Sequence, residues 1–491
     1  MQGLTAILTV NVLLYMMAGV VVAMFLGAIP GMTGSVVMAI LIPFIIGKDP
    51  ITAMALLLGA HATCEFSGAI SSILINTPAS GLTVATCYDG YPMAQKGEAS
   101  RAISIAAMAS MIGGIFGALV LMASLPIMKP MLLSLGASEY FVMAFVGLTF
   151  IAVLGGKSMS KSLMAGGVGL MLSMIGQDPI SGTARYAFGT IYLWDGIPLI
   201  PFVVGVFAFS GMADIFSRGG KTISTVEVKD GGVRQGIKDV WTHIGMTLKC
   251  SALGTVIGMI PGLGGTVSNL MAYGYAAKTS KHKEMFGTGW PEGEIAPEAA
   301  NHSKEGGSLI PTVALGIPGS VGMAIILGVF MMLGLVPGPD MLTKNLHVTF
   351  SLVFTLVISN IMATALGLVL ARHLAKFTFL PLKYVVPSVL VLSSIGAYLE
   401  GGLFGNLLVA FVMGLIGIGF ERFGFPKAPL IIGLILGALV ERYLHISLDV
   451  YGPTFILQRP ISLFLVIVII AALSLPPLVR KFRSTKGGEA I

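Results

Sequence analysis

The chain has 491 residues, of which 55% are hydrophobic and only 10% are charged. A water-soluble protein of this length could not cover its surface with so few charged residues, so we expect the chain to fold in a lipid bilayer. The formal net charge of +7 is assigned to cytoplasmic loops, which are rich in Lys and Arg, and it does not indicate a nucleic-acid partner.

Apolar segments recur along the chain. Six of them approach or reach the roughly 20 residues that a helix needs to cross a bilayer: 4–29, 103–127, 140–154, 346–371, 384–399 and 461–475. With shorter and glycine-interrupted runs included, the sequence predicts an all-α polytopic membrane protein with about a dozen transmembrane segments. The first segment lacks the features of a signal peptide and is interpreted as a retained helix.

A polar stretch at residues 215–242 interrupts this pattern. It carries five basic side chains, namely Arg218, Lys221, Lys229, Arg234 and Lys238. Such loops stay in the cytoplasm, so we expect a cytoplasmic linker here and a cytoplasmic tail at 481–491. The predicted organisation is an N-terminal transmembrane repeat (1–214), the linker, a C-terminal transmembrane repeat (243–458), an additional transmembrane helix (459–480) and the tail.

The two regions flanking the linker share motifs in the same order, which indicates a duplication. The matched pairs are residues 27–34 with 258–265, 75–80 with 315–320, 139–142 with 383–386, and 201–205 with 429–433. Segment 461–475 has no partner. If the linker and the tail are both cytoplasmic, the C-terminal repeat without this helix crosses an odd number of times, which predicts that the two repeats are inverted.

Gly/Pro loops are expected to interrupt helices at membrane depth, giving broken helices and helical hairpins. Irregular backbone survives in the bilayer only where protein buries it or where it lines a cavity. The free amides at the start of each following half-helix suit a carboxylate. The candidate substrate-binding residues are Gly31, Met32, Thr33, Gly34, Ser35, Asn76, Thr77, Gly262, Leu263, Gly264, Gly265, Thr266, Gly319 and Ser320. The alternative is that these glycines and prolines serve only helix packing or kinks.

Aligning the repeats at their prolines pairs His61 with Asn301 and Glu65 with Glu305. An ionisable group in apolar surroundings marks a pathway or a coupling site, so Glu65 and Asn301 are candidates for ion coupling. For other ionisable residues, solvated charges or local ion pairs are an equally good interpretation; these are Glu292, Glu294, Glu298, Glu305, His302, His347, His373 and His445.

The sequence carries no familiar catalytic motif. It has no HExxH, no GxSxG and no Walker lysine loop, so we expect neither an enzyme nor an ATP-driven pump. Its three cysteines, Cys64, Cys87 and Cys250, show no CxxC spacing, so we assign no disulfide, no metal site and no cofactor.

Several long strings resemble the large membrane subunit of tripartite tricarboxylate transporters, the TctA family. They lie at residues 68–78, 89–99, 291–301, 306–311 and 315–320. The resemblance implies a multi-pass protein of the bacterial inner membrane. Such a subunit works with a small transmembrane subunit and a periplasmic solute-binding protein, and it imports citrate-like or other carboxylates by ion-coupled transport. The chain departs from the usual family sequence at 63–67 and 76–80, beside the expected pocket.

The hypothesis from the sequence is alternating access, in which the broken helices move against a scaffold of the remaining helices. Sodium held by carbonyl and hydroxyl groups at the breaks is the expected coupling ion, and a proton on Glu65 is the competing one. Two further alternatives remain. One is a channel or membrane anchor, and the other is a stand-alone carrier that needs no binding protein.

Overall fold

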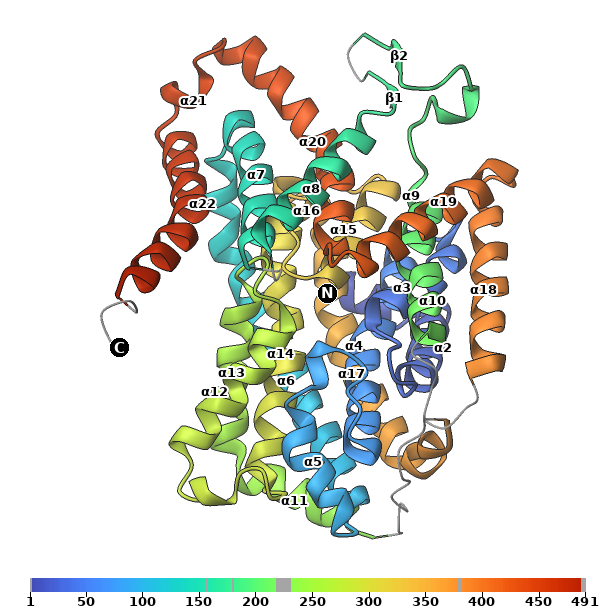
Figure 1. Cartoon of the computed structure of the whole chain (residues 1–491), viewed down its shortest axis with the longest axis vertical. Helices are drawn as coiled ribbons and strands as arrows, with labels where there is room; N and C mark the ends of the chain where they lie inside the picture. The colour runs from blue at the N-terminus through green and yellow to red at the C-terminus, as the bar shows by residue number, and fades with distance from the viewer. Residues whose placement is uncertain (1, 155–157, 179–180, 218–230, 378–381, 487–491) are drawn as a thin grey trace.

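The structure is a computed structural model that describes residues 2–154, 158–178, 181–217, 231–377 and 382–486. It is built almost entirely of helices (Figure 1). Within these ranges, seven helical stretches are long and apolar enough to cross a membrane: Val10–Gly27, Pro50–Ile75, Ala99–Leu133, Leu199–Ser217, Leu346–Leu370, Phe404–Arg422 and Lys427–Tyr451. Six shorter apolar helices accompany them in the same described part of the chain. The predicted all-α polytopic fold is confirmed.

The first half contains α1 (Gln2–Ile7), α2 (Val10–Gly27), α3 (Gly34–Leu41), η1 (Ile42–Ile45), α4 (Pro50–Ile75), η2 (Gly81–Thr83), α5 (Thr86–Gln95), α6 (Ala99–Leu133), α7 (Ala137–Leu154), α8 (Met159–Ser173), the short strands β1 (Gly176–Gln177) and β2 (Ala184–Arg185), η3 (Ile191–Leu193), α9 (Leu199–Val203), the π-helix η4 (Val204–Phe209) and α10 (Ser210–Ser217). The expected single helix over 4–29 is wrong, because the chain breaks between α1 and α2 at Leu8 and Thr9.

The second half contains α11 (Val233–Thr242), α12 (Ile244–Gly258), α13 (Gly264–Thr279), η5 (Lys283–Met285), α14 (Pro291–Leu315), α15 (Val321–Met332), α16 (Pro339–Leu342), α17 (Leu346–Phe377), α18 (Leu382–Leu399), α19 (Phe404–Arg422), α20 (Lys427–Tyr451), α21 (Phe455–Gln458) and α22 (Pro460–Lys486). The linker predicted at 215–242 therefore ends in a helix, α11, and its residues 218–230 lie outside the described part of the chain.

The two halves repeat the same order of elements. The pair α2 and α3 corresponds to α12 and α13, α4 to α14, and α6, α7 and α8 to α17, α18 and α19. The packing also repeats with the halves exchanged, since α6 packs against α14 while α17 packs against α4. Likewise α11 contacts α6 and α1 contacts α17. Each half thus places its central helix against the long helix of the other half.

The matched loops share their backbone conformation. Gly31 and Gly262 have φ of 85° and 84°, a left-handed conformation that glycine adopts without strain. Asn76 and Gly316 end α4 and α14 with φ of 52° and 68°. The helix breaks predicted after Gly27, Ile75, Gly258 and Leu315 are all present.

Closely packed glycines join the helices around α14. A β-carbon at Gly113 or Gly117 of α6 would overlap the backbone of α14, and so would one at Gly254 or Gly258 of α12. Small residues of this kind let membrane helices approach closely. Packing is therefore the role of these glycines.

We expect Gly254→Ala to destabilise the protein more than Gly245→Ala. The new methyl group would overlap the carbonyl oxygen of Ala300, whereas a methyl group at Gly245 on the same helix would have no described atom within 4 Å. Overpacking of this kind costs about 1–3 kcal/mol. Melting temperatures of the two variants in detergent check the prediction, and equal values would contradict it.

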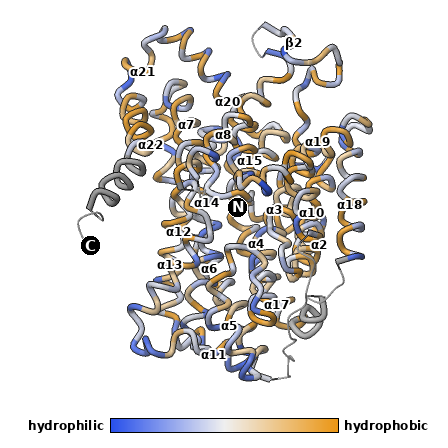
Figure 2. The backbone as a smooth tube through the Cα atoms, in the orientation of Figure 1, coloured by the Kyte–Doolittle hydropathy of each residue, from blue (hydrophilic) through white to orange (hydrophobic). Residues whose placement is uncertain are grey.

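The helix α22 lies at the edge of the bundle and packs on α7 (Figure 1). At its start Arg459 Nε lies 2.9 Å from Glu139 Oε1, and Ser462 Oγ donates to the same carboxylate at 3.0 Å. Hydrophilic residues gather at the end that carries α5 and α11, while the central part is mostly hydrophobic (Figure 2). This distribution suits a protein surrounded by lipid.

Candidate functional site

A group of buried polar side chains lies where α4 meets α14; we call it the central cluster. It consists of His61 and Glu65 on α4 and Asn301, Lys304 and Glu305 on α14, none more than 3% exposed. His61 Nε2 lies 3.2 Å from Glu305 Oε2, and Lys304 Nζ lies 2.6 Å from Glu305 Oε1. Two carboxylates and two basic groups therefore share a small space away from solvent.

Many polar atoms of the central cluster lack a well-formed partner among the described residues. Both ring nitrogens of His61, both carboxylate oxygens of Glu305 and both amide atoms of Asn301 have no hydrogen bond of good geometry there. Asn301 faces Glu65. Buried polar groups are nearly always satisfied in a resting core, so such a set indicates a place for a ligand, ion or water.

The helices that follow the first break of each half begin beside this cluster. A β-carbon at Gly34, the first residue of α3, would lie 2.7 Å from His61 Nδ1 and 3.1 Å from Glu65 Oε1. One at Gly265, in the first turn of α13, would lie 2.7 Å from Lys304 Nζ. The absence of side chains at both positions brings the half-helix starts close to the charged groups.

The loops of one half also meet the breaks of the other. The start of α15 reaches the cluster, since a β-carbon at Gly322 would overlap the ring of His61. Gly81, after the α4 loop, lies against Thr266 of α13. Residues beside all four predicted breaks therefore lie around the paired helices α4 and α14.

The predicted substrate-binding residues have varied surroundings. Thr33 and Ser320 cap α3 and α15, where their hydroxyls accept from Val36 N and Met323 N. Thr77 donates to the carbonyl of Ile75. These hydroxyls therefore take part in the backbone structure of the breaks.

Other predicted residues fall into three groups. Gly34 and Gly265 adjoin the central cluster, and Gly319 N donates to Thr312 Oγ1. Gly31 and Gly262 lie instead against Ile215 of α10 and Phe150 of α7. The remaining members lie on the loops or the first helical turns, namely Met32, Ser35, Asn76, Leu263 and Gly264.

The acidic residues of α14 are buried, which excludes the interpretation that they are solvated charges. Glu294 and Glu298 are 0% exposed, and Glu298 accepts from Thr86 Oγ1 at 2.5 Å and from Ser110 Oγ at 3.2 Å. Glu305 makes a local ion pair, but inside the protein. Among the histidines predicted to be solvated or locally paired, His302 is buried, His347 is exposed and His445 is half-buried. The side chain of His373 lies outside the described part of the structure.

Asp89 is a structural residue that the sequence interpretation missed. Its carboxylate accepts from the backbone nitrogens of Gly289 and Trp290, both at 2.8 Å, and from Gly287 N at 3.1 Å. Tyr273 donates to it at 3.0 Å. These three nitrogens belong to the loop that leads into α14, whose first helical residue is Pro291, so Asp89 of α5 fixes the loop from which α14 begins.

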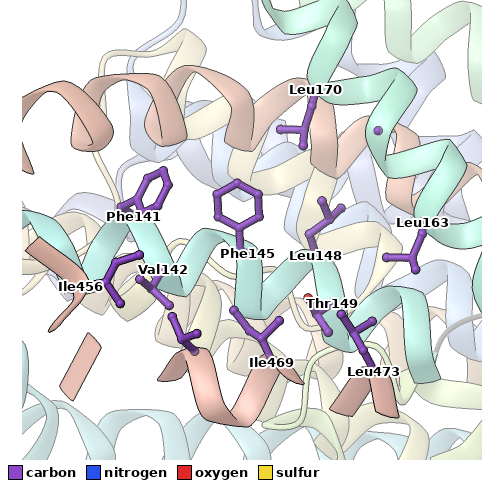
Figure 3. Close-up of a pocket in the computed structure, with 12 residues that line it drawn as sticks. Phe141, Val142, Phe145, Leu148, Thr149, Leu163, Leu170, Ile456, Ile469 and Leu473 are labelled. Carbon is purple, nitrogen blue, oxygen red and sulfur yellow. The ribbon is translucent and has the colours of Figure 1, made fainter. Parts of the chain in front are cut away.

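A separate apolar pocket lies between α7, α8 and α22 (Figure 3). Its volume is about 370 Å³, and its lining includes Phe141, Phe145, Leu148 and Ile469. Thr149 supplies a hydroxyl, but the described residues that line the pocket include no charged one. This pocket does not suit a carboxylate, which needs charge or hydrogen-bond donors.

The sequence match decides the family. Residues 13–432 match the model of the tripartite tricarboxylate transporter TctA family. The chain belongs to this family. The TctA-family match covers both halves and the central cluster, so these features belong to a subunit of a transport system.

Two proteins of Agrobacterium vitis are relatives of this TctA-family chain. One is described as an uncharacterized 52.8 kDa protein in the TAR-I ttuC' 3' region; it is 31% identical over 448 residues, 90% of this chain and 88% of the relative. The other is described as an uncharacterized protein in the TAR-II ttuC' 3' region, 31% identical over 227 residues, 45% of this chain and 94% of the relative. No solved structure matches the chain.

Proposed function

We propose that this chain imports small di- or tricarboxylates across the bacterial inner membrane by sodium-coupled alternating access. The observation that carries the proposal is the central cluster, which lies between the starts of half-helices from both repeats. Transporters built from repeats bind their solute at such a place, near the bilayer midplane. Family membership supports the transport system as a whole.

The chemistry of the centre favours an anionic solute. Two half-helix starts present their positive ends there, and Lys304 adds an ammonium group beside Gly265. The backbone amide of Gly34 and the hydroxyl of Ser320 are further donors for carboxylate oxygens. A sugar or a cationic amine would not use this arrangement.

A cation is the natural companion of such a solute. Ligand atoms of His61, Glu65 and Glu305 lie within 4.8 Å of one another. The two carboxylates supply oxygen ligands of the kind that a hard cation such as sodium takes. A proton on Glu65 is the competing coupling ion.

The orientation follows from the basic linker. We place the end with α5 and α11 in the cytoplasm, so that the end with the β1–β2 hairpin and α21 faces the periplasm (Figure 1). The helices that follow the matched breaks after α4 and α14 are α5 and α15. In that view α5 lies low and α15 higher, which supports inverted repeats. A periplasmic binding protein would deliver the solute at the upper end, and a small transmembrane subunit would complete the system.

Uptake into proteoliposomes tests this function. We expect the purified chain with its small subunit and binding protein to accumulate labelled carboxylate against its gradient when sodium is high outside. Passive equilibration would instead indicate a channel, and accumulation without the binding protein would indicate a stand-alone carrier.

The Glu65→Gln variant separates the two coupling ions. If Glu65 carries the coupled proton, the variant loses the pH dependence of uptake. We expect uptake to keep its pH dependence and to lose at least tenfold in apparent sodium affinity, because a carboxylate ligand becomes an amide. Initial rates at varied sodium and pH decide between them, and a lost pH dependence with unchanged sodium affinity would contradict our expectation.

A further inference from the structure

We propose that Lys304 acts as an exchangeable internal cation. Its ammonium group moves from Glu305 to the carboxylate of the solute, and this movement opens the His61–Glu65–Glu305 site to sodium. This inference rests on the proposed function, since it states how the solute and the ion are coupled. It assigns Lys304 a role in anion binding that the sequence interpretation did not give it.

The geometry of the ion pair favours exchange. Lys304 and Glu305 are consecutive residues of α14, and consecutive side chains of a helix point in different directions. Their 2.6 Å contact lacks good hydrogen-bond geometry at either Glu305 oxygen. The long lysine side chain therefore bends back onto its neighbour, and a better-placed anion can compete for it.

The ammonium group lies where a solute carboxylate would bind. A β-carbon at Gly265 would lie 2.7 Å from Lys304 Nζ, so the ammonium lies beside the start of α13. A solute carboxylate at that half-helix end would meet backbone amides and Lys304 together. The pairing with Glu305 holds the ammonium ready beside this position.

Charge balance links the solute to the ion. A buried carboxylate that loses its cationic partner is strongly disfavoured. When Lys304 turns to the solute, Glu305 and Glu65 are left close together with the His61 ring beside them. A sodium ion restores the balance. The amide of Asn301, which has no well-formed hydrogen bond among the described residues, offers it a further oxygen.

The arrangement explains coupling in thermodynamic terms. Sodium binds poorly while the ammonium occupies Glu305, and the solute binds poorly while Lys304 stays paired. Each ligand therefore raises the affinity for the other by the same factor. A solute without sodium would leave an uncompensated carboxylate in the bilayer interior.

Sodium binding by variants tests the exchange without any need to know the solute. Purified protein in detergent is titrated with ²²Na⁺ in choline chloride, without carboxylates. We expect Lys304→Gln to bind sodium at least tenfold more tightly than the unchanged protein, because no ammonium competes. Adding Glu305→Gln should abolish the gain. Lys281→Gln, at an exposed position, serves as the matched control and should behave like the unchanged protein.

Other outcomes would overturn the exchange. No gain in Lys304→Gln, or a gain that survives Glu305→Gln, would contradict it. If Lys304→Gln does not fold, the unchanged protein still provides a test, because low-millimolar sodium affinity without solute would also contradict it. Failure of the proposed function appears separately, as absence of uptake in proteoliposomes while the sodium titration keeps its expected pattern.

Discussion

Replacing Glu305 by Gln is expected to reduce sodium-driven uptake roughly 100-fold or more, the largest effect that we expect of any single substitution. The change removes the carboxylate that lies 2.6 Å from Lys304 and 3.2 Å from His61. The carboxylate is a ligand of the proposed sodium site, and a loss of about 3 kcal/mol in ion binding corresponds to about a factor of 100 in affinity. Initial uptake rates in proteoliposomes measure the loss.

The control for this substitution is Glu284→Gln. Glu284 lies in η5, and its side chain is 72% exposed, so its loss should leave uptake within about twofold. Size-exclusion profiles show whether both variants remain folded. A folded Glu305→Gln protein with nearly normal uptake would show that transport does not depend on the central cluster.

The second large effect is expected for Asp89→Asn. The carboxylate accepts from three backbone nitrogens of the loop just before α14 and from the Tyr273 hydroxyl. Hydrogen bonds to a charged group contribute about 1.5–3 kcal/mol each, and an amide would direct its own N–H groups at some of these donors. We expect a loss of about 3 kcal/mol in stability, measured as a clear drop in melting temperature.

Asp195→Asn provides the comparison, because Asp195 is exposed in a loop and its substitution should change stability by less than about 0.5 kcal/mol. Since α14 carries three members of the central cluster, Asp89→Asn should also reduce uptake. An Asp89→Asn protein as stable as Asp195→Asn would show that the start of α14 is held by other contacts.

The elements and breaks of the fold were largely predictable from the sequence. Hydrophobic runs give membrane helices directly, and the Pro-Gly pairs at 30–31 and 261–262 mark interruptions because proline lacks a donor and glycine tolerates positive φ. The division between α1 and α2 was missed, since Leu8 and Thr9 sit in a run with no Gly or Pro. Hydropathy alone does not reveal a short break of this kind.

The site was predicted only in part. Pairing Glu65 with Glu305 through the duplication pointed to two helices that do meet. Lys304 was missed because a charged segment such as 291–305 has the polarity of a solvent-exposed loop. Asp89 was missed because its partners at 287–290 lie about 200 residues away in the sequence. One indication in the sequence was spacing, since Glu294, Glu298 and Glu305 fall at intervals of four and seven, which place them on one helix face.

The duplication aligns Lys304 of one half with Cys64 of the other, at the same register that aligns Glu305 with Glu65. In a transporter with two identical inverted halves, the inward-facing and outward-facing forms would have the same free energy. With an ammonium on one side and a neutral thiol on the other, the two forms differ in charge around the centre. In the proposed alternating-access cycle, this difference and that between His61 and Asn301 at a neighbouring aligned pair would give the empty carrier a preferred resting side.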